Sequence, residues 1–478
     1  MRRIVADTKN RNGMSSMEDN KNVKKRMIPF SPPDVGEKEL EEIASAIFSG
    51  WITTGPRVKR FEQMLENYCQ TGSAITRENN DVICNLVCLS SATAALELNL
   101  RVLGVGPGDE VLVPAYTYTA TVSPVIHCGA KPILIDIQKG GDAVTHCPEM
   151  DYDALELAIT ERTKAIIAVD LGGLVCDYER IFAAVEHKRY LFRPKKSDGT
   201  LLGNLSTKIQ EGLGCVAVLG DCAHALGAQQ LVKRTGSGEL EVPAWRKAGK
   251  IAHFSSFSFH AVKNLTTAEG GASTWSLPDS VYDQGVTDEE LYQMYQMLSL
   301  HGHSRDALAK QELGSWEYDI IGPWYKCNMT DLSAAMGLAQ LERYEEMLER
   351  RREIIRCYDE CCDELGIDHL VHQTDTMCSS GHLYLIRIPG WEEQERNQAI
   401  KALAELGITT NVHYKPLPMF TAYKALGWDI KDFPNAFDYY KNLISLPLYS
   451  KLSKEDAAYV CQALKQVVGK RRKEESHA

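Results

Sequence analysis

The chain has 478 residues, of which 44% are hydrophobic and 24% are charged. This length allows several domains and a large buried core, and the composition is typical of a folded globular enzyme rather than a disordered or collagen-like chain. The net charge of −11 argues against a general binder of nucleic acid or of anionic membranes, because such proteins need dense positive charge.

The 14 cysteines are scattered without the paired spacing of zinc sites or of small disulfide frameworks. The closest groups, Cys84 with Cys88 and Cys357 with Cys361 and Cys362, are better explained as small apolar side chains in a core than as a metal site. No apolar run is long enough to span a membrane, and the N-terminus lacks the apolar segment of a signal peptide. We therefore expect reduced thiols, no metal and a cytoplasmic protein.

Residues 1–26 carry many basic side chains and no hydrophobic periodicity, so they are predicted to be a solvated tail, with a basic targeting or docking arm as the alternative. Helices are predicted at about 37–48 and 57–70. Between them lies the sequence Gly50-Trp-Ile-Thr53-Thr-Gly-Pro. This turn suits either a simple connection or a ligand-facing loop that would include Thr53.

Residues 27–285 are predicted to form a large α/β domain. Short apolar runs, separated in several places by helical stretches, indicate strands buried on both faces and hence a mainly parallel sheet. Ligands bind at the carboxyl ends of the strands in such sheets. Two polar stretches, about 185–213 and 230–250, look like surface insertions. The predicted strands are 82–89, 110–113, 132–137, 165–171, 215–219 and 253–259.

Residues 286–478 are predicted to contain connecting helices and a smaller domain. A long charged amphipathic helix is expected from about 331 to 365. A strand at 383–388 and a helix at about 392–406 then indicate a small α+β domain that closes the chain.

Three features of the large domain carry chemistry. The sequence Ser90-Ser-Ala92-Thr93-Ala-Ala-Leu follows a strand and opens a helix, so it is either an ordinary cap or a site for a phosphate group. Asp221 ends an apolar strand, where a buried carboxylate needs a cationic partner, although it could also face the surface. His224 follows three residues later.

The third feature is Lys263, which lies among hydroxyls, aromatic rings and glycines. A lone lysine in a loop is usually solvated, but desolvation frees the amine of a Schiff-base lysine by lowering its pKa. A phosphate site, a strand-end aspartate and such a lysine, in this order on an α/β frame, are what pyridoxal phosphate (PLP) requires.

Five ordered motifs between about residue 28 and residue 467 resemble those of the DegT/DnrJ/EryC1/StrS sugar aminotransferases. They are Gly108-Asp-Glu-Val-Leu-Val-Pro-Ala-Tyr-Thr-Tyr118-Thr-Ala-Thr, Asp221-Cys-Ala-His224-Ala-Leu-Gly-Ala, Ser258-Phe-His-Ala-Val-Lys263-Asn-Leu-Thr-Thr-Ala-Glu-Gly-Gly, Tyr325-Lys-Cys-Asn328-Met-Thr-Asp-Leu-Ser-Ala-Ala and Val412-His413-Tyr414-Lys-Pro-Leu-Pro. The resemblance implies an aspartate aminotransferase-like architecture (PLP fold type I) and a homodimer with shared active sites.

The resemblance also implies roles for single residues. Lys263 would bind PLP covalently, Asp221 would keep its pyridine nitrogen protonated, and His224 would lie near the ring. Tyr118 would stack on the ring face. The phosphate would be bound by Ala92, Thr93 and Ser258, and by Asn328 of the other subunit. The roles of Tyr118 and Asn328 rest on the resemblance alone. Without it, Tyr118 would be an aromatic residue at the end of a strand and Asn328 would be a helix cap.

The implied reaction moves an amino group from an amino acid to a keto sugar attached to a nucleotide. The resemblance implies glutamate as the amino acid. Arg305, His413 and Tyr414 are expected substrate contacts, with packing or a surface salt bridge as the alternative. Asp170 and Pro418 depart from residues common in the family and are expected to reshape the acceptor pocket. Alternative functions are a PLP-dependent sugar dehydratase, which would have His in place of Lys263, and a non-catalytic PLP-binding regulatory protein.

Overall fold

The computed structural model describes residues 26–71, 85–304 and 317–475. A seven-stranded sheet in the order β1-β9-β8-β5-β4-β2-β3 forms the centre of the described structure. Six of its strands run in the same direction, and β9 is antiparallel to both of its neighbours. The strands are β1 (Leu86–Leu89), β2 (Glu110–Pro114), β3 (Lys131–Ile135), β4 (Thr163–Val169), β5 (Ala217–Asp221), β8 (Phe254–Ser258) and β9 (Gly271–Trp275).

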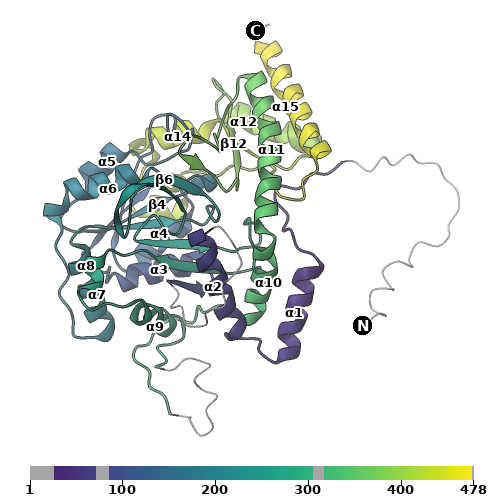
Figure 1. Cartoon of the computed structure of the whole chain (residues 1–478). Coiled ribbons are helices and arrows are strands. Elements are labelled where there is room, and N and C mark those ends of the chain that lie inside the picture. The colour runs from purple at the N-terminus through teal and green to yellow at the C-terminus, as the bar shows by residue number, and fades with distance from the viewer. Residues whose placement is uncertain (1–25, 72–84, 305–316, 476–478) are drawn as a thin grey trace.

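Helices surround this sheet, because its strands are apolar on both faces (Figure 1). The helices that follow the N-terminal pair are α3 (Ala92–Val102), α4 (Thr119–His127), α5 (Tyr152–Ala158), α6 (Tyr178–His187), α7 (Leu201–Leu213), α8 (Asp279–Tyr282) and α9 (Asp288–Ser299). The mainly parallel α/β architecture predicted from the sequence is therefore confirmed.

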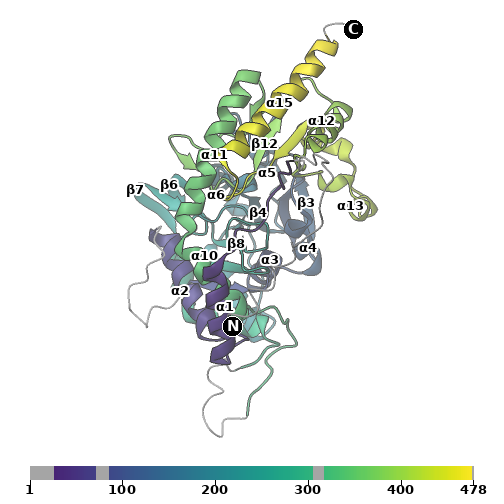
Figure 2. The same cartoon turned by 90° about the vertical axis from the view of Figure 1, so that its right-hand side faces the viewer.

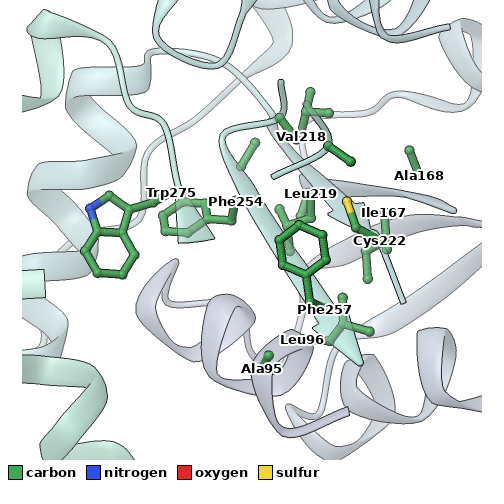
Figure 3. Packing of buried hydrophobic residues seen from close by; sticks show 14 of the residues in the cluster. Ala95, Leu96, Ile167, Ala168, Val218, Leu219, Cys222, Phe254, Phe257 and Trp275 are labelled. Carbon is green, nitrogen blue, oxygen red and sulfur yellow. The ribbon is translucent and has the colours of Figure 1, made fainter. Parts of the chain in front are cut away.

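The core between α3 and the sheet is built from fully buried side chains. Ala95 and Leu96 of α3 lie against Phe257 of β8, and Phe254 is paired with Trp275 of β9 (Figure 3). Burying one such large apolar side chain stabilises the fold by about 1.5–3 kcal/mol. This packing fixes the N-terminus of α3 against the carboxyl ends of β1 and β8.

A smaller antiparallel sheet with its own hydrophobic cluster lies toward the C-terminus. Its strands are β10 (Asp368–His369), β12 (Tyr384–Arg387) and β13 (Leu443–Leu446). The helices α11 (Tyr344–Leu365) and α15 (Lys454–Glu475) pack side by side next to it (Figures 1 and 2). The remaining helices of this part are α12 (Glu393–Glu405), α13 (Thr421–Ala425) and α14 (Pro434–Lys441).

The single long helix predicted at 331–365 is wrong. The chain forms α10 (Asp331–Glu342) and α11, which are separated at Arg343. Arg343 leaves the helical conformation, and its guanidinium is in ion pairs with Asp34 and Glu39. The first helices, α1 (Glu37–Ser49) and α2 (Pro56–Thr71), pack on α10 at this end of the molecule (Figure 2).

The two polar stretches expected as surface insertions take different forms. Residues 201–213 are helix α7, whose side chains Leu205, Ile209 and Leu213 are buried in the core, which differs from the expectation. Residues 229–247 are the hairpin β6 (Gln229–Thr235) and β7 (Gly238–Lys247), which pairs with β11 (Met377–Cys378). Within the described ranges no helix is long and apolar enough to cross a membrane.

Candidate active site

A cavity of about 370 Å³ opens at the carboxyl ends of the parallel strands. The N-terminus of α3, the end of β5, the turn after β8 and the segment around Tyr414 all contribute to its lining. Nine of the predicted site residues line it: Ala92, Thr93, Tyr118, Asp221, His224, Ser258, Lys263, His413 and Tyr414. The structure thus brings together residues that lie more than three hundred positions apart in the sequence.

One end of the cavity is suited to an anion. The hydroxyl of Ser91 caps α3 by accepting a hydrogen bond from the N–H of Ala94 at 3.1 Å. The first N–H groups of a helix have no partner within it, and they carry the positive end of the helix dipole. The site also needs Gly271, because a Cβ there would lie 2.3 Å from the carbonyl carbon of Ser91.

The opposite side of the cavity holds Asp221, which is buried. Its Oδ2 accepts a hydrogen bond from the hydroxyl of Thr121 at 2.8 Å. Thr121 donates its only hydroxyl hydrogen to Asp221. In the 2.7 Å contact between the hydroxyls of Thr117 and Thr121, the donor is therefore Thr117. Burial raises the pKa of Asp221, although Thr121, the N–H of Ala223 and the charge of Lys263 oppose the rise.

The half-buried Lys263 points its amine into the same cavity. Burial lowers the pKa of Lys263 to about 8, and the negative charge of Asp221 opposes the decrease. Within the described part of the chain, the side-chain amine of Lys263 makes no hydrogen bond and no ion pair at 4.0 Å or less. The cavity therefore contains a nucleophilic amine and, apart from it, a buried carboxylate that needs a cationic partner.

His224 and Tyr414 close the cavity. The N–H of Gly172 donates to Nδ1 of His224 at 3.2 Å, and Nε2 of His224 lies 3.2 Å from the hydroxyl of Tyr414. Burial and the nearby Lys263 lower the pKa of His224 well below its ordinary value, so this imidazole is neutral. The half-exposed ring of Tyr118 lies 5.6 Å from the ring of Tyr414.

The model of the DegT/DnrJ/EryC1/StrS aminotransferase family matches residues 33–192 and 208–465. The chain belongs to this family. A spore coat polysaccharide biosynthesis protein of Bacillus subtilis, SpsC, is 34% identical over 450 residues, which are 92% of this chain and 97% of that protein. The resemblance read from the five motifs is thereby confirmed.

Solved structures agree with the family assignment. Spr1654 of Streptococcus pneumoniae, a candidate sugar aminotransferase solved in a PMP form, is 49% identical with a TM-score of 0.80, and the match covers 93% of this chain and 99% of that one. Its PLP form gives 47% identity, a TM-score of 0.79 and the same coverage. Helicobacter pylori PseC shares the fold at 23% identity and a TM-score of 0.70, covering 93% of this chain and all of PseC.

This member of the family is a PLP-dependent sugar aminotransferase with fold type I. Its cavity fits that cofactor chemically, because it offers a free amine at Lys263, a buried carboxylate at Asp221 and the unpaired N–H groups that begin α3. In the described residues no group of three or more His, Cys, Asp or Glu side chains is placed to hold a metal ion.

Two predicted site residues lie outside this cavity. Asn328 lines a second cavity of about 360 Å³, where it donates to the hydroxyl of Thr54 and accepts from Lys326. The side chain of Thr53 is exposed and lines neither cavity, while its carbonyl oxygen accepts the N–H of Asp331. Arg305 lies outside the described residues.

Asp170, which departs from the family pattern, does not line the cavity. Its buried carboxylate accepts hydrogen bonds from the N–H of Cys176 at 3.0 Å, the thiol of Cys222 at 3.2 Å and the hydroxyl of Tyr178 at 3.3 Å. Pro418 is also buried, within the short turn Leu417–Met419, and does not line the cavity.

Sequence reasoning missed Thr121, the residue that holds Asp221. The available signal was the run of hydroxyls in Tyr116-Thr-Tyr-Thr-Ala-Thr121. Thr121 lies in the first turn of α4, and Thr117 lies two residues before that helix begins. Nothing in the sequence, however, indicates that the hydroxyl of Thr121 meets the end of β5.

Proposed function

We propose that this enzyme transfers the amino group of an amino acid, expected to be glutamate, to a keto sugar attached to a nucleotide. The observation that carries the proposal is the placement of Lys263 and Asp221 in one cavity beside the N-terminus of α3. The relative SpsC is named for polysaccharide biosynthesis. Monosaccharides enter such polymers in activated form, which supports a nucleotide-linked acceptor.

The proposed residue roles follow the geometry. Lys263 forms the covalent link to PLP, and Asp221 pairs with the pyridinium nitrogen, which supplies the cation that the buried carboxylate lacks. Tyr118 stacks on the cofactor ring, and His224 lies beside it. Ala92 and Thr93 at the start of α3 bind the phosphate together with Ser258.

PLP supplies an electron sink that makes the Cα hydrogen of the amino donor acidic. Lys263 then acts as the base, because its pKa of about 8 lets the free amine accept a proton near neutral pH. The Nζ atom would move a proton from the donor Cα to the C4′ carbon of the cofactor in one half-reaction, and from that C4′ carbon to the sugar carbon in the other. His413 and Tyr414, which line the cavity, contact the substrate.

The active enzyme is proposed to be a homodimer in the cytoplasm. Asn328 of one subunit would bind the cofactor phosphate of the other, and Thr53 and Arg305 would contact the substrate. The position of Asn328 in a separate cavity of its own chain supports a role across an interface. All the described cysteines are free thiols, as expected in a reducing compartment.

The covalent link is tested by the visible spectrum and by trapping. The holoenzyme should absorb at about 420 nm, and glutamate should bleach the band. Borohydride reduction followed by peptide mapping should place the adduct on Lys263. Lys263→Ala should lose the adduct and the activity, whereas Lys164→Ala, at a buried lysine far from the cavity, should keep both. An adduct on another lysine would contradict the assignment.

The substrate class is tested by a screen with ¹⁵N-labelled glutamate. Keto sugars linked to nucleoside diphosphates and the same keto sugars without the nucleotide are compared by mass spectrometry. Label in the nucleotide-linked product alone would support the proposal. Amination of the free sugars at equal kcat/KM would contradict the nucleotide requirement, and transfer from other amino acids but not from glutamate would contradict the donor.

A further inference from the structure

Two buried histidines lie side by side at the cavity, with their ring planes tilted by 41°. The ring of His224 lies 4.3 Å, centroid to centroid, from the ring of His382. His382 is 5% exposed and does not line the cavity. It belongs to a segment before β12, Ser380-Gly-His382, which packs on the turn Gly172–Gly173 and on Asn264, the residue that follows Lys263.

The neighbours of each histidine fix the position of its proton. The N–H of Gly172 donates to Nδ1 of His224, so the neutral ring carries its hydrogen on Nε2 and donates it to the hydroxyl oxygen of Tyr414. The hydroxyl hydrogen of Tyr414 is then free to point into the cavity. This arrangement makes Tyr414 a hydrogen-bond donor toward the substrate.

His382 has the opposite tautomer. The amide nitrogen of Asn264 donates to the carbonyl oxygen of Ser380 at 2.8 Å, which directs the amide oxygen of Asn264 toward Nδ1 of His382 at 2.9 Å. If the amide of Asn264 were flipped, its oxygen would face the carbonyl oxygen of Ser380, and neither atom could donate a hydrogen bond. Nδ1 of His382 therefore carries the hydrogen, and both rings are neutral, because burial lowers the pKa of each well below its ordinary value.

The segment is held in place from three sides. The N–H groups of Ser380 and His382 donate to the carbonyl oxygens of Gly173 and Gly172, each at 3.0 Å, and the hydroxyl of Ser380 donates to the carbonyl oxygen of His224 at 2.5 Å. A Cβ on Gly173, whose φ is +94°, would lie 2.1 Å from that hydroxyl oxygen.

On the far side, Nη1 of the buried Arg351 on α11 donates to the carbonyl oxygens of Gly381 at 3.2 Å and Leu448 at 3.1 Å. After burial, the groups that act most strongly on His382 are His224, Lys263, Arg351 and His413. All four are bases, and each lowers the pKa of His382 and so favours its neutral form.

We propose that His382 and Asn264 are positioning residues that, through Ser380, hold His224 in its neutral Nε2–H form and fix the backbone beside Lys263. They act through the residues that line the cavity and do not touch the substrate themselves. This inference rests on the proposed role of Lys263 as the amine that binds PLP.

The test records the visible absorption band of the PLP-loaded enzyme as a function of pH. This titration gives a midpoint pH, and kcat is measured for the same proteins. His382→Asn keeps an N–H at the position of Nδ1 and should leave the midpoint and kcat close to wild type. His382→Phe keeps an aromatic ring beside His224 but has no N–H, and His382→Gln moves the N–H by one methylene. Both should move the midpoint by about one pH unit and lower kcat about tenfold, because each loses one buried hydrogen bond.

His253 provides the matched control. It is equally buried and neutral, and it accepts the N–H of Val218 at the opposite end of the strands. His253→Phe should lower the Tm but leave the midpoint unchanged.

The outcomes separate the two proposals. Wild-type spectra without a lysine-dependent band would overturn the proposed function, and this inference with it. A normal wild-type band together with an unshifted midpoint and kcat in folded His382→Phe or His382→Gln would overturn the positioning role alone. Equal shifts in His382→Asn and His382→Phe would also overturn it, because the hydrogen-bond donor would then be irrelevant.

Discussion

Asp170→Asn should change how the stability of the enzyme depends on pH. Burial raises the pKa of Asp170 to about 7, although three hydrogen-bond donors oppose the rise. In the unfolded chain an aspartate has a pKa of about 3.9. Between about pH 3.9 and about pH 7, Asp170 therefore binds a proton in the folded state that it does not bind in the unfolded state. The free energy of unfolding contributed by Asp170 therefore falls as pH rises through this window and is level above it.

The size of the effect follows from the width of the window. Each pH unit well inside the window contributes about 1.4 kcal/mol, so raising the pH from 5 to 9 removes about 2.7 kcal/mol from the wild type. Asparagine is neutral at every pH, and its amide oxygen can still accept the N–H of Cys176 and the hydroxyl of Tyr178. The unfolding free energy of Asp170→Asn minus that of wild type should thus rise by about 2.7 kcal/mol from pH 5 to pH 9.

Urea denaturation followed by circular dichroism at pH 5, 6, 7, 8 and 9 measures this difference. Asp153→Asn, at an 87% exposed side chain, controls for the loss of one negative charge. Parallel curves for Asp170→Asn and wild type over the whole range would refute the reasoning, because they would show that Asp170 has the same affinity for protons in both states.

Two further substitutions test how the chain builds the cofactor site. Thr121→Val removes the hydroxyl that donates to Asp221 at 2.8 Å. The binding of PLP, measured by fluorescence titration, should weaken about tenfold. An unchanged Kd would show that this hydroxyl does not support the carboxylate. Gly271→Ala brings a Cβ to 2.3 Å from the backbone of Ser91 and should lower both the Tm and the affinity for PLP, whereas Gly36→Ala, with its nearest contact at 3.7 Å, should leave affinity unchanged.

The sequence predicted the elements of the sheet well wherever a strand is a continuous apolar run. It missed β9, because Gly271-Ala-Ser-Thr-Trp275 is short and rich in hydroxyls, and the pairing of this strand with β1 and β8 is a long-range property. It also joined α10 to α11, because amphipathic periodicity continues through Arg343 while the ion pairs with Asp34 and Glu39 come from a distant segment.

The chain by itself determined the chemistry of this enzyme, since a lysine among glycines and hydroxyls, a strand-end aspartate and a capped helix are set by the order of the residues. Only the tertiary structure decided which other side chains serve them. Thr121 reaches Asp221 because α4 packs beside β5, and His382 meets His224 because a segment 158 positions further along packs on the same turn. Local periodicity specifies helices and strands, whereas these contacts depend on how the elements pack together.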